Sequence, residues 1–419
     1  MHSLRPVTIF WLLLVPLVAD AQPSARPWPQ CGGPTRDFHI ESVPLATTWP
    51  DAGPPELWRR SLGRGQSSIV AAHDTLVTML RDGDDEVVIA LDPTTGATRW
   101  RYVYPAPLAR NGYVDIWLNA AGPGPYSTPL IAGPRVFTVG LDGQFHALDL
   151  ETGQLHWSHD LVERFELDVY NAFASSPVAF GELVLLPLGG SERGVVAFAG
   201  DTGLVMWESV PFAVAPSSPM LIDVDGQTQV VVMGQQEVAG LHPADGRLLW
   251  RHPHPNELGL NLSMPVWGPN NDLFTSSGYD SGSRMIHLSQ IDGRTTPEET
   301  WHTNRLRIHF SNALRIGPLI LGSSGDFGPA FLTAIEAETG NERWRDRRFA
   351  RAHMLYADDK LIISDEDGQL ALASLTDEGL EVLAEAQLLE AIAWTAPTLV
   401  DGVLYARDHE SIVALDLKR

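Results

Sequence analysis

A hydrophobic pattern recurs along the chain and organises it. Short segments in which apolar residues alternate with other residues lead into a tight turn with Gly, and a second segment then ends on Trp. The clearest copies cover residues 88–100, 145–157, 196–207 and 332–344, and a weaker copy at 238–250 keeps the Gly and the Trp. Alternation predicts a strand with one buried face, and Gly permits the positive φ of the turn. Each copy is therefore predicted to be a β-hairpin.

A second signature lies upstream of the hairpins. A step of small residues and Pro is followed by an apolar stretch, most clearly at residues 127–139 and 175–186. Shorter copies of the step occur at residues 217–219, 263–265 and 395–397. This stretch supplies the inner strands, so each repeat unit is predicted to have four strands. The Trp at the end of the outer strand is expected to cover the gap between neighbouring sheets.

The terminal Trp residues count the units. From Trp58 to Trp344 they stand 42 to 57 residues apart, which brackets the ~40 to 50 residues of β-propeller repeats. A unit without Trp follows at 354–383, and the last unit, 394–417, ends after three strands. Residues 57–60 resemble an outer strand without its hairpin, so they are predicted to complete the last unit and close the ring. The prediction is an all-β, eight-bladed β-propeller with four-stranded antiparallel blades; seven blades are the alternative if the unit without Trp is an insertion.

The N-terminal residues have the pattern of a secretory signal peptide. Arg5 precedes an apolar run at residues 7–19, and small residues up to Ala21 follow it. The run is shorter than the roughly 20 residues of a membrane-spanning helix. We therefore expect a soluble protein, exported to the periplasm or secreted, in three parts: a signal peptide at 1–21, an N-terminal arm at 22–53 and the propeller at 54–419.

Charge and cysteine content narrow the possible partners. The formal net charge is −23, and such an acidic surface repels nucleic acids and anionic membranes. Cys31 is the single cysteine, so no disulfide can form within the chain. Cys31 lies beyond the expected cleavage site, so we predict that it carries no lipid anchor. We expect its thiol to be unreactive; the alternative is that it pairs with a cysteine of another chain. We expect a monomer with no nucleic-acid binding and no membrane insertion.

The repeat resembles that of a known family. The pattern Ala-Leu-Asp-x-x-Thr-Gly-x-x-x-Trp is similar to the repeat of pyrroloquinoline-quinone (PQQ)-like propellers, and residues 28–37 resemble the start common in exported bacterial proteins of this class. The resemblance covers nearly the whole chain from Trp28 onward and implies the fold, but a fold does not define an activity. In this class, quinoprotein alcohol and sugar dehydrogenases hold PQQ and Ca²⁺ in the central funnel. The propeller subunit of the outer-membrane barrel-assembly machinery is a binding scaffold without a cofactor.

Several features favour the scaffold over the dehydrogenase. One cysteine cannot supply the adjacent-cysteine disulfide that the alcohol dehydrogenases stack on the quinone, and no Cys-x-x-Cys-His haem motif is present. The Glu, Asn and Asp metal ligands of those enzymes match no motif in this chain. We expect an exported, non-catalytic protein, with no cofactor and no metal, that binds a protein or a small molecule through its funnel face. The alternative is a PQQ-dependent alcohol or sugar dehydrogenase with calcium.

Candidate binding residues lie in the connections between units. In a propeller these connections, from each outer strand to the next inner strand, lie on the funnel face, and here they are long and rich in polar and aromatic residues. Side chains just before each inner strand are predicted to ring the channel mouth and form a ligand pocket. They are Tyr126, Asn171, Asn261, Arg307, His309, Asn312, His353 and Trp394. The alternative is that they satisfy loop backbone groups and pack the blades together.

Three other motifs are assigned to structure and not to chemistry. His252 and His254 have the spacing of two metal ligands on a strand, but no third ligand is evident, so we expect loop histidines that face solvent. Residues 223–226 resemble half a calcium loop, although Asp-Gly is equally a hairpin turn. Ser281 lacks the Gly-x-Ser-x-Gly spacing of a serine nucleophile and is interpreted as a loop residue.

Overall fold

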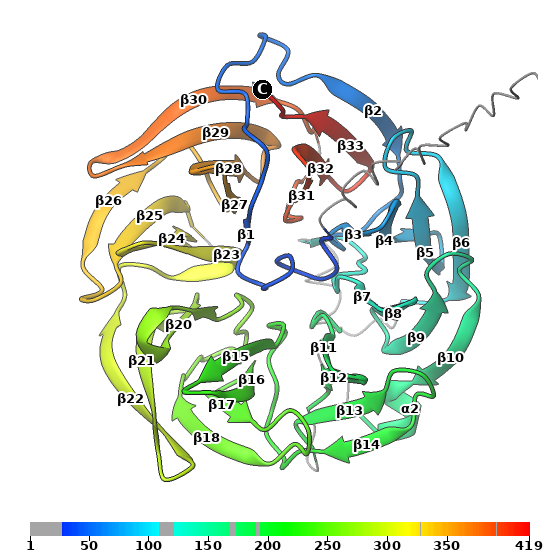
Figure 1. Cartoon of the computed structure of the whole chain (residues 1–419), viewed down its shortest axis with the longest axis vertical. Coiled ribbons are helices and arrows are strands. Elements are labelled where there is room, and N and C mark those ends of the chain that lie inside the picture. Colours follow the sequence, from blue (N-terminus) through cyan, green and yellow to red (C-terminus); the bar gives the residue numbers. More distant parts are fainter. Residues whose placement is uncertain (1–26, 109–120, 168–172, 190–192, 327, 391) are drawn as a thin grey trace, which may run out of the picture.

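The chain forms a ring of blades around a central channel (Figure 1). The structure, a computed structural model, describes all residues except 1–26, 109–120, 168–172, 190–192, 327 and 391. The described residues form eight sheets, each with four antiparallel strands in series. This confirms the predicted eight-bladed β-propeller and rules out a ring of seven. One sheet gains a fifth strand, β1 (His39–Ile40), which pairs in parallel with the inner strand β27 (His353–Ala357).

Within each blade, the strands are given in order from the inner strand at the channel to the outer strand at the rim. The first four blades are β3 (Val70–Ala72), β4 (Thr75–Asp82), β5 (Asp85–Leu91) and β6 (Thr98–Pro105); β7 (Leu130–Ala132), β8 (Arg135–Val139), β9 (Gln144–Asp149) and β10 (Leu155–Asp160); β11 (Val178–Phe180), β12 (Leu183–Pro187), β13 (Val195–Ala199) and β14 (Val205–Glu208); β15 (Met220–Val224), β16 (Gln227–Met233), β17 (Glu237–Leu241) and β18 (Leu248–Pro253). The described helices include α2 (Leu161–Phe165) and the short 3-10 turn η1 (Pro269–Asn271).

The other four blades follow the same order. They are β19 (Val266–Trp267), β20 (Asp272–Ser277), β21 (Gly282–Ile291) and β22 (Arg294–Thr303); β23 (Ile308–Ile316), β24 (Leu319–Ser324), β25 (Phe331–Glu336) and β26 (Glu342–Asp346); β27, β28 (Lys360–Ser364), β29 (Gln369–Thr376) and β30 (Gly379–Gln387); β31 (Thr398–Val400), β32 (Val403–Arg407), β33 (Ser411–Asp416) and β2 (Glu56–Ser61). The unit without Trp is therefore a complete blade, β27 to β30, and not an insertion.

The N-terminal strand closes the ring as predicted. Strand β2 pairs antiparallel with β33, so that Trp58 faces Ala414 and Arg60 faces Ile412. Pairing of β2 with β33 covers the edge that a three-stranded last blade would leave open. Because the two strands come from opposite ends of the chain, the ring is held shut by contacts between distant residues.

The repeated Trp links each blade to the next one. Trp100 Nε1 donates to Leu150 O at 2.9 Å in the hairpin turn of the following blade. The same bond to the next turn is made by Trp58, Trp157, Trp207 and Trp301. Trp250 and Trp344 are exceptions. Trp250 donates within its own blade to Gln229 Oε1, and the blade after it has no Thr-Gly turn to receive the indole. Trp344 Nε1 makes no hydrogen bond to a described residue.

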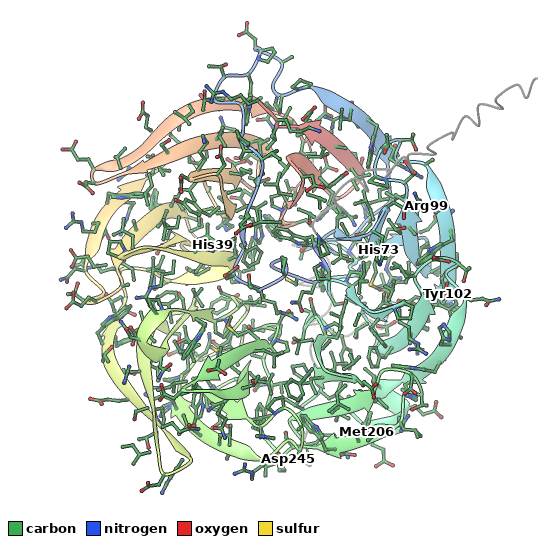
Figure 2. All side chains as sticks on the ribbon, in the orientation of Figure 1. His39, His73, Arg99, Tyr102, Met206 and Asp245 are labelled. Atoms are coloured by element: carbon green, nitrogen blue, oxygen red, sulfur yellow. The ribbon has the colours of Figure 1, made fainter. Side chains whose placement is uncertain are left out.

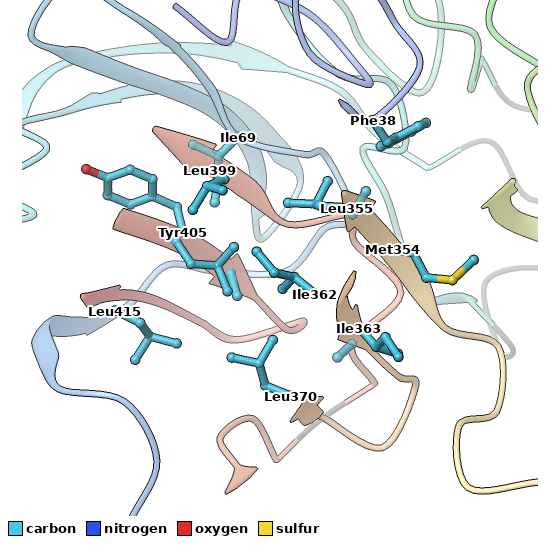
Figure 3. Close-up of a cluster of buried hydrophobic side chains, with 14 of the residues drawn as sticks. Phe38, Ile69, Met354, Leu355, Ile362, Ile363, Leu370, Leu399, Tyr405 and Leu415 are labelled. Carbon is cyan, nitrogen blue, oxygen red and sulfur yellow. The ribbon is translucent and has the colours of Figure 1, made fainter. Parts of the chain in front are cut away.

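The apolar core is divided into clusters between blades. The largest cluster joins the last two blades to the first and includes Ile69, Leu399, Leu415 and Phe38 (Figure 3). At the rim, Tyr102 and Met206 lie on outer strands, whereas His39 of β1 lies near the centre of the ring (Figure 2). Among the helices of the described residues, none has the length and apolar character needed to cross a membrane.

Candidate functional site: the central channel

The small-residue step before each inner strand forms a belt of hydrogen bonds around the channel. The backbone N–H of Thr128 donates to Ser176 Oγ at 2.9 Å, and that of Ser176 donates to Ser218 Oγ at 2.9 Å. The N–H of Ser68 donates in the same way to Thr128 Oγ1 at 3.3 Å. We call these four residues, Ser68, Thr128, Ser176 and Ser218, the hydroxyl belt. The hydroxyls of Thr128, Ser176 and Ser218 each satisfy a buried N–H of the preceding blade, which explains why small polar residues occupy these positions.

The opposite half of the channel wall is built differently. There the position equivalent to the belt is Met264 or Ala396 in two blades. Asn312 replaces the hydroxyl with an amide, whose Nδ2 donates to Met354 O and whose Oδ1 accepts from Met354 N, both at 2.9 Å. The wall is therefore polar on the side of the belt and more apolar and aromatic on the other side.

The N-terminal arm closes one end of the channel. Trp28 and Ala71 exchange two backbone hydrogen bonds of 2.8 Å, and Tyr356 N donates to Phe38 O at 3.0 Å. Ala71 is the middle residue of β3 and Tyr356 lies in the second half of β27, whereas the belt lies before the inner strands begin. The arm thus crosses the ring at the end opposite the funnel face, as its path over the centre of Figure 1 shows.

Arg36 anchors the arm inside the ring. Its side chain is buried, and Nη1 donates to Pro177 O at 3.0 Å and to Gln30 Oε1 at 3.2 Å. Burial lowers the pKa of Arg36 to about 10. Cys31, which follows Gln30, lies with its Sγ 3.7 Å from Met264 Sδ, and burial raises the pKa of this thiol. A raised pKa favours the protonated form of the thiol; that Cys31 is unreactive stays a prediction.

Between the arm and the funnel face lies a cavity of about 230 Å³. Its floor comes from Cys31 and Phe38 of the arm, and its walls come from residues before the inner strands. The lining residues are Cys31, Phe38, Gln66, Ser68, Ala121, Tyr126, Thr128, Leu141, Ala174, Ser176, Pro216, Ser218, Leu260, Leu262, Met264, His309, Phe310, Ser311, Asn312, His353, Trp394 and Ala396. No Asp, Glu, Lys or Arg is among these described residues. In a chain with a formal net charge of −23, the described part of the cavity lining is uncharged.

Five of the eight residues predicted from the sequence line this cavity: Tyr126, His309, Asn312, His353 and Trp394. Asn261 lies behind the wall, where its Nδ2 donates to Gly234 O at 2.7 Å, so the alternative role in loop packing applies to it. Arg307 points away to an ion pair with Asp280. Asn171 lies outside the described residues.

An aromatic cluster forms the apolar side of the wall. The rings of Phe310 and Trp394 have centroids 4.5 Å apart, and His353 lies 6.3 Å from Phe310. Trp394 Nε1 donates to Glu366 Oε2 at 3.2 Å, and the other oxygen of Glu366 pairs with Arg351 at 2.7 Å. This pair orients the Trp394 ring from outside the cavity.

The two histidines of the lining are neutral. Burial lowers the pKa of both His309 and His353 to about 4. His309 shares a hydrogen bond of 2.5 Å with the hydroxyl of Tyr279. His353 is 7% exposed, and neither of its ring nitrogens makes a hydrogen bond of normal geometry to a described residue. Contact with the backbone of Trp394 raises the pKa of His353 and so offsets a part of the decrease that burial causes.

Phe310, the hydroxyl belt and the arm were not predicted as parts of the pocket. The Ser-x-Pro step was interpreted as the start of a strand only, although its recurrence once per blade is the signal that could have placed it at the channel. The arm has no repeat pattern, so its sequence contains no corresponding signal.

The expectation that His252 and His254 face solvent is wrong for His254. This ring is fully buried, with Nε2 3.0 Å from Ser277 Oγ and Nδ1 3.2 Å from Thr275 Oγ1. Burial lowers its pKa to about 3, and the nearby guanidinium of Arg284 adds to the shift. Across the described part of the chain, no group of three His, Cys, Asp or Glu side chains could hold a metal ion.

An eight-bladed ring of these hairpins defines a propeller of the PQQ-like repeat class. The chain belongs to the family whose sequence model is described as outer membrane protein assembly factor BamB. That model matches residues 52–210 and 84–306, which together span more than half of the chain.

Individual relatives lie in both branches of the class. The outer membrane protein assembly factor BamB of Yersinia pestis is 24% identical over 343 residues, which cover 73% of this chain and 79% of that protein. Methanol dehydrogenase (cytochrome c) subunit 1 of Paracoccus denitrificans is 29% identical over 154 residues, but these cover 36% of this chain and only 22% of the dehydrogenase.

Solved structures show the same fold. BamB from Moraxella catarrhalis superposes with a TM-score of 0.59 at 16% identity, covering 88% of this chain and 99% of that one. Quinohemoprotein alcohol dehydrogenase from Comamonas testosteroni superposes with a TM-score of 0.61 at 13% identity, covering 94% of this chain and 81% of that one. At these identities the likeness establishes the propeller and not an activity.

Proposed function

We propose that this chain is an exported, non-catalytic propeller that binds a protein partner or a small ligand through its funnel face. The observation that carries the non-catalytic part is the uncharged lining of the described cavity. Membership of the assembly-factor family supports a binding role. The signal-peptide pattern of residues 1–21 supports export to the periplasm, and these residues lie outside the described part.

The cavity does not fit the cofactor of the quinoprotein enzymes. Calcium takes six to eight oxygen ligands in proteins, and carboxylates are prominent among them. The described lining offers hydroxyl and amide groups but no carboxylate for calcium, and it offers no Lys or Arg to neutralise the carboxylates of an anionic quinone. No reaction through PQQ is therefore assigned to this chain.

The funnel face offers exposed charged groups around the channel mouth. Arg305 is exposed in the connection between β22 and β23, and Asp280 is exposed in the loop between β20 and β21. The Yersinia pestis relative is named as an assembly factor of the outer membrane. By this relationship, we propose a protein of the cell envelope as the partner of this face.

Photocrosslinking tests the proposal. A photoreactive amino acid at Arg305 or Asp280 should crosslink the exported chain to a discrete partner in the periplasm of its native cells. Matched positions on the opposite face are Asp201 and Glu338, which are exposed in hairpin turns and should yield little product. Crosslinks only from Asp201 and Glu338 would contradict the assignment of the funnel face. Mass spectrometry of the recovered protein should place its N-terminus after Ala21, and recovery from the cytoplasm with an intact leader would contradict export.

A further inference from the structure

The cavity is small and its described lining is mostly apolar. Its volume of about 230 Å³ falls below the roughly 300 to 1,000 Å³ of sites for drug-sized ligands. A cavity of about 150 Å³ is enough to bind benzene in a protein core. The space therefore suits a compound of one or two rings.

The uncharged lining discriminates by charge. An ionised ligand that enters the cavity loses its hydration and finds no opposite charge among the described lining residues. The penalty for such an unpaired charge is large, whereas an uncharged aromatic ring loses little. The rings of Phe310 and Trp394, together with Met264 in the same half of the wall, offer apolar and edge contacts to a flat ring.

One buried polar group in the wall calls for a partner. His353 is 7% exposed and lines the cavity. The backbone of Trp394 is a weak hydrogen-bond partner for its ring, and neither ring nitrogen makes a hydrogen bond of normal geometry to a described residue. Buried polar groups in proteins are nearly always hydrogen-bonded to protein, water or ligand. A neutral imidazole offers one donor and one acceptor, so a hydroxyl group on the ligand can satisfy it in either direction. The hydroxyl belt across the cavity offers further polar contacts to the same class of ligand.

We propose that the central cavity binds an uncharged aromatic compound of one or two rings that carries a hydroxyl group, with the hydroxyl bonded to His353 and the ring against Phe310 and Trp394. This inference rests on the binding role proposed above and specifies its ligand. This class of ligand differs from an anionic quinone because it is uncharged and needs no metal ion in order to bind.

Calorimetry and ligand-observed NMR with naphthol test the proposal on the purified mature protein at neutral pH. Naphthol should bind saturably at one site per chain. Naphthoate of the same ring system carries a negative charge and should bind at least about tenfold more weakly. Equal or tighter binding of naphthoate would overturn the proposal, and so would the absence of saturable naphthol binding.

Two variants locate the site. His353→Phe removes the hydrogen bond and should weaken naphthol binding about fivefold to tenfold. Ala396→Trp fills the cavity and should abolish binding, and thermal unfolding verifies that each variant is folded. The matched control is His73→Asn, at an exposed turn with positive φ that Asn tolerates, and it should bind as the unchanged protein does.

Unaltered naphthol binding by folded His353→Phe and Ala396→Trp proteins would place the ligand elsewhere and overturn the inference. The crosslinks from Arg305 and Asp280 do not depend on the cavity. Loss of naphthol binding with crosslinks retained would therefore refute this inference alone, and loss of the crosslinks alone would refute the partner role of the funnel face.

Discussion

The indole of Trp58 covers Gly96 in the hairpin turn of the neighbouring blade. A Cβ on Gly96 would lie 2.6 Å from Trp58 Cε3, and Trp58 Nε1 donates to Pro93 O at 2.8 Å in the same turn. The glycine of the repeat thus has two reasons to be there, a φ of +69° and the ring that lies against it. The first could be predicted from the turn, and the second depends on the next blade.

Gly96→Ala should destabilise the ring by about 2–4 kcal/mol. The substitution combines the left-handed backbone, at about 1 kcal/mol for a residue with Cβ, with overpacking against the indole, at about 1–3 kcal/mol. Urea unfolding measures the change. Gly83→Ala is the matched control, because Gly83 has a φ of +63° but no atom within 4 Å of the added Cβ. Equal losses in both variants would show that the contact with Trp58 contributes nothing.

Arg407→Met should weaken the closure of the ring by about 3 kcal/mol or more. The buried guanidinium donates to Met79 O at 2.8 Å and to Ser67 O and Gly63 O at 3.2 Å, so it joins the last blade to the first. Removal of the guanidinium takes this donor from the carbonyl groups of Met79 and Gly63, whereas Ser67 O keeps its bond from Thr78 Oγ1. Arg99→Met, which breaks exposed ion pairs, should change stability by less than about 1 kcal/mol. A similar effect of both variants in urea unfolding would argue against closure through Arg407.

Deletion of residues 54–62 should abolish cooperative folding. The deletion removes β2 and leaves β33 as an open edge in a ring that cannot close. Circular dichroism and size-exclusion chromatography should show loss of the native signal or aggregation. A monomeric, cooperatively unfolding product would mean that the seven complete blades suffice.

Acid should destabilise the protein between about pH 6.5 and pH 4. Burial lowers the pKa of His146, His309 and His353 to about 4, so the unfolded chain takes up protons in this range while the folded chain does not. The shift at His353 corresponds to about 3 kcal/mol at most, reached near pH 4. Asp365, whose pKa burial raises to about 6, acts in the opposite direction.

The acid effect is measured as the urea midpoint against pH. His353→Phe should flatten the fall on the acid side relative to the unchanged protein, because it removes one buried group that resists protonation. His73→Asn, at an exposed turn, should leave the profile unaltered. An identical slope for His353→Phe and the unchanged protein would contradict the neutral, buried state of His353.

PQQ with Ca²⁺ should show no stoichiometric binding to the purified protein. The described lining contains no carboxylate for the metal and no cation for the quinone. Titration calorimetry and the absorbance of the quinone provide the measurement, with dye-linked oxidation of alcohols and sugars as the activity assay. Tight binding with turnover would restore the dehydrogenase and refute the non-catalytic proposal.

Much of the fold could be predicted from the sequence because a hairpin forms between residues that are close together in the sequence. The Thr-Gly turn, the alternating strands and the terminal Trp lie within about a dozen residues of each other, so each unit carries its own evidence. Even the unit without Trp could be counted, since its turn at residues 376–379 is intact. Closure by residues 57–60 followed from a strand with no hairpin of its own.

The channel was decided by the tertiary structure. Every blade contributes residues to its wall, and the hydrogen bond from Thr128 N to Ser176 Oγ joins positions 48 residues apart. The arm reaches the cavity through Phe38, which contacts the backbone of Tyr356, and no local pattern encodes such a contact. His254 was misplaced for the same reason, because its burial is set by strands that pack around it. The sequence by itself determined the blades and the residues that precede each inner strand, and it favoured eight blades over seven; the tertiary structure decided the number. Which of those residues meet at the cavity depended on closing the ring, since that step alone brings one position of every blade to a common axis.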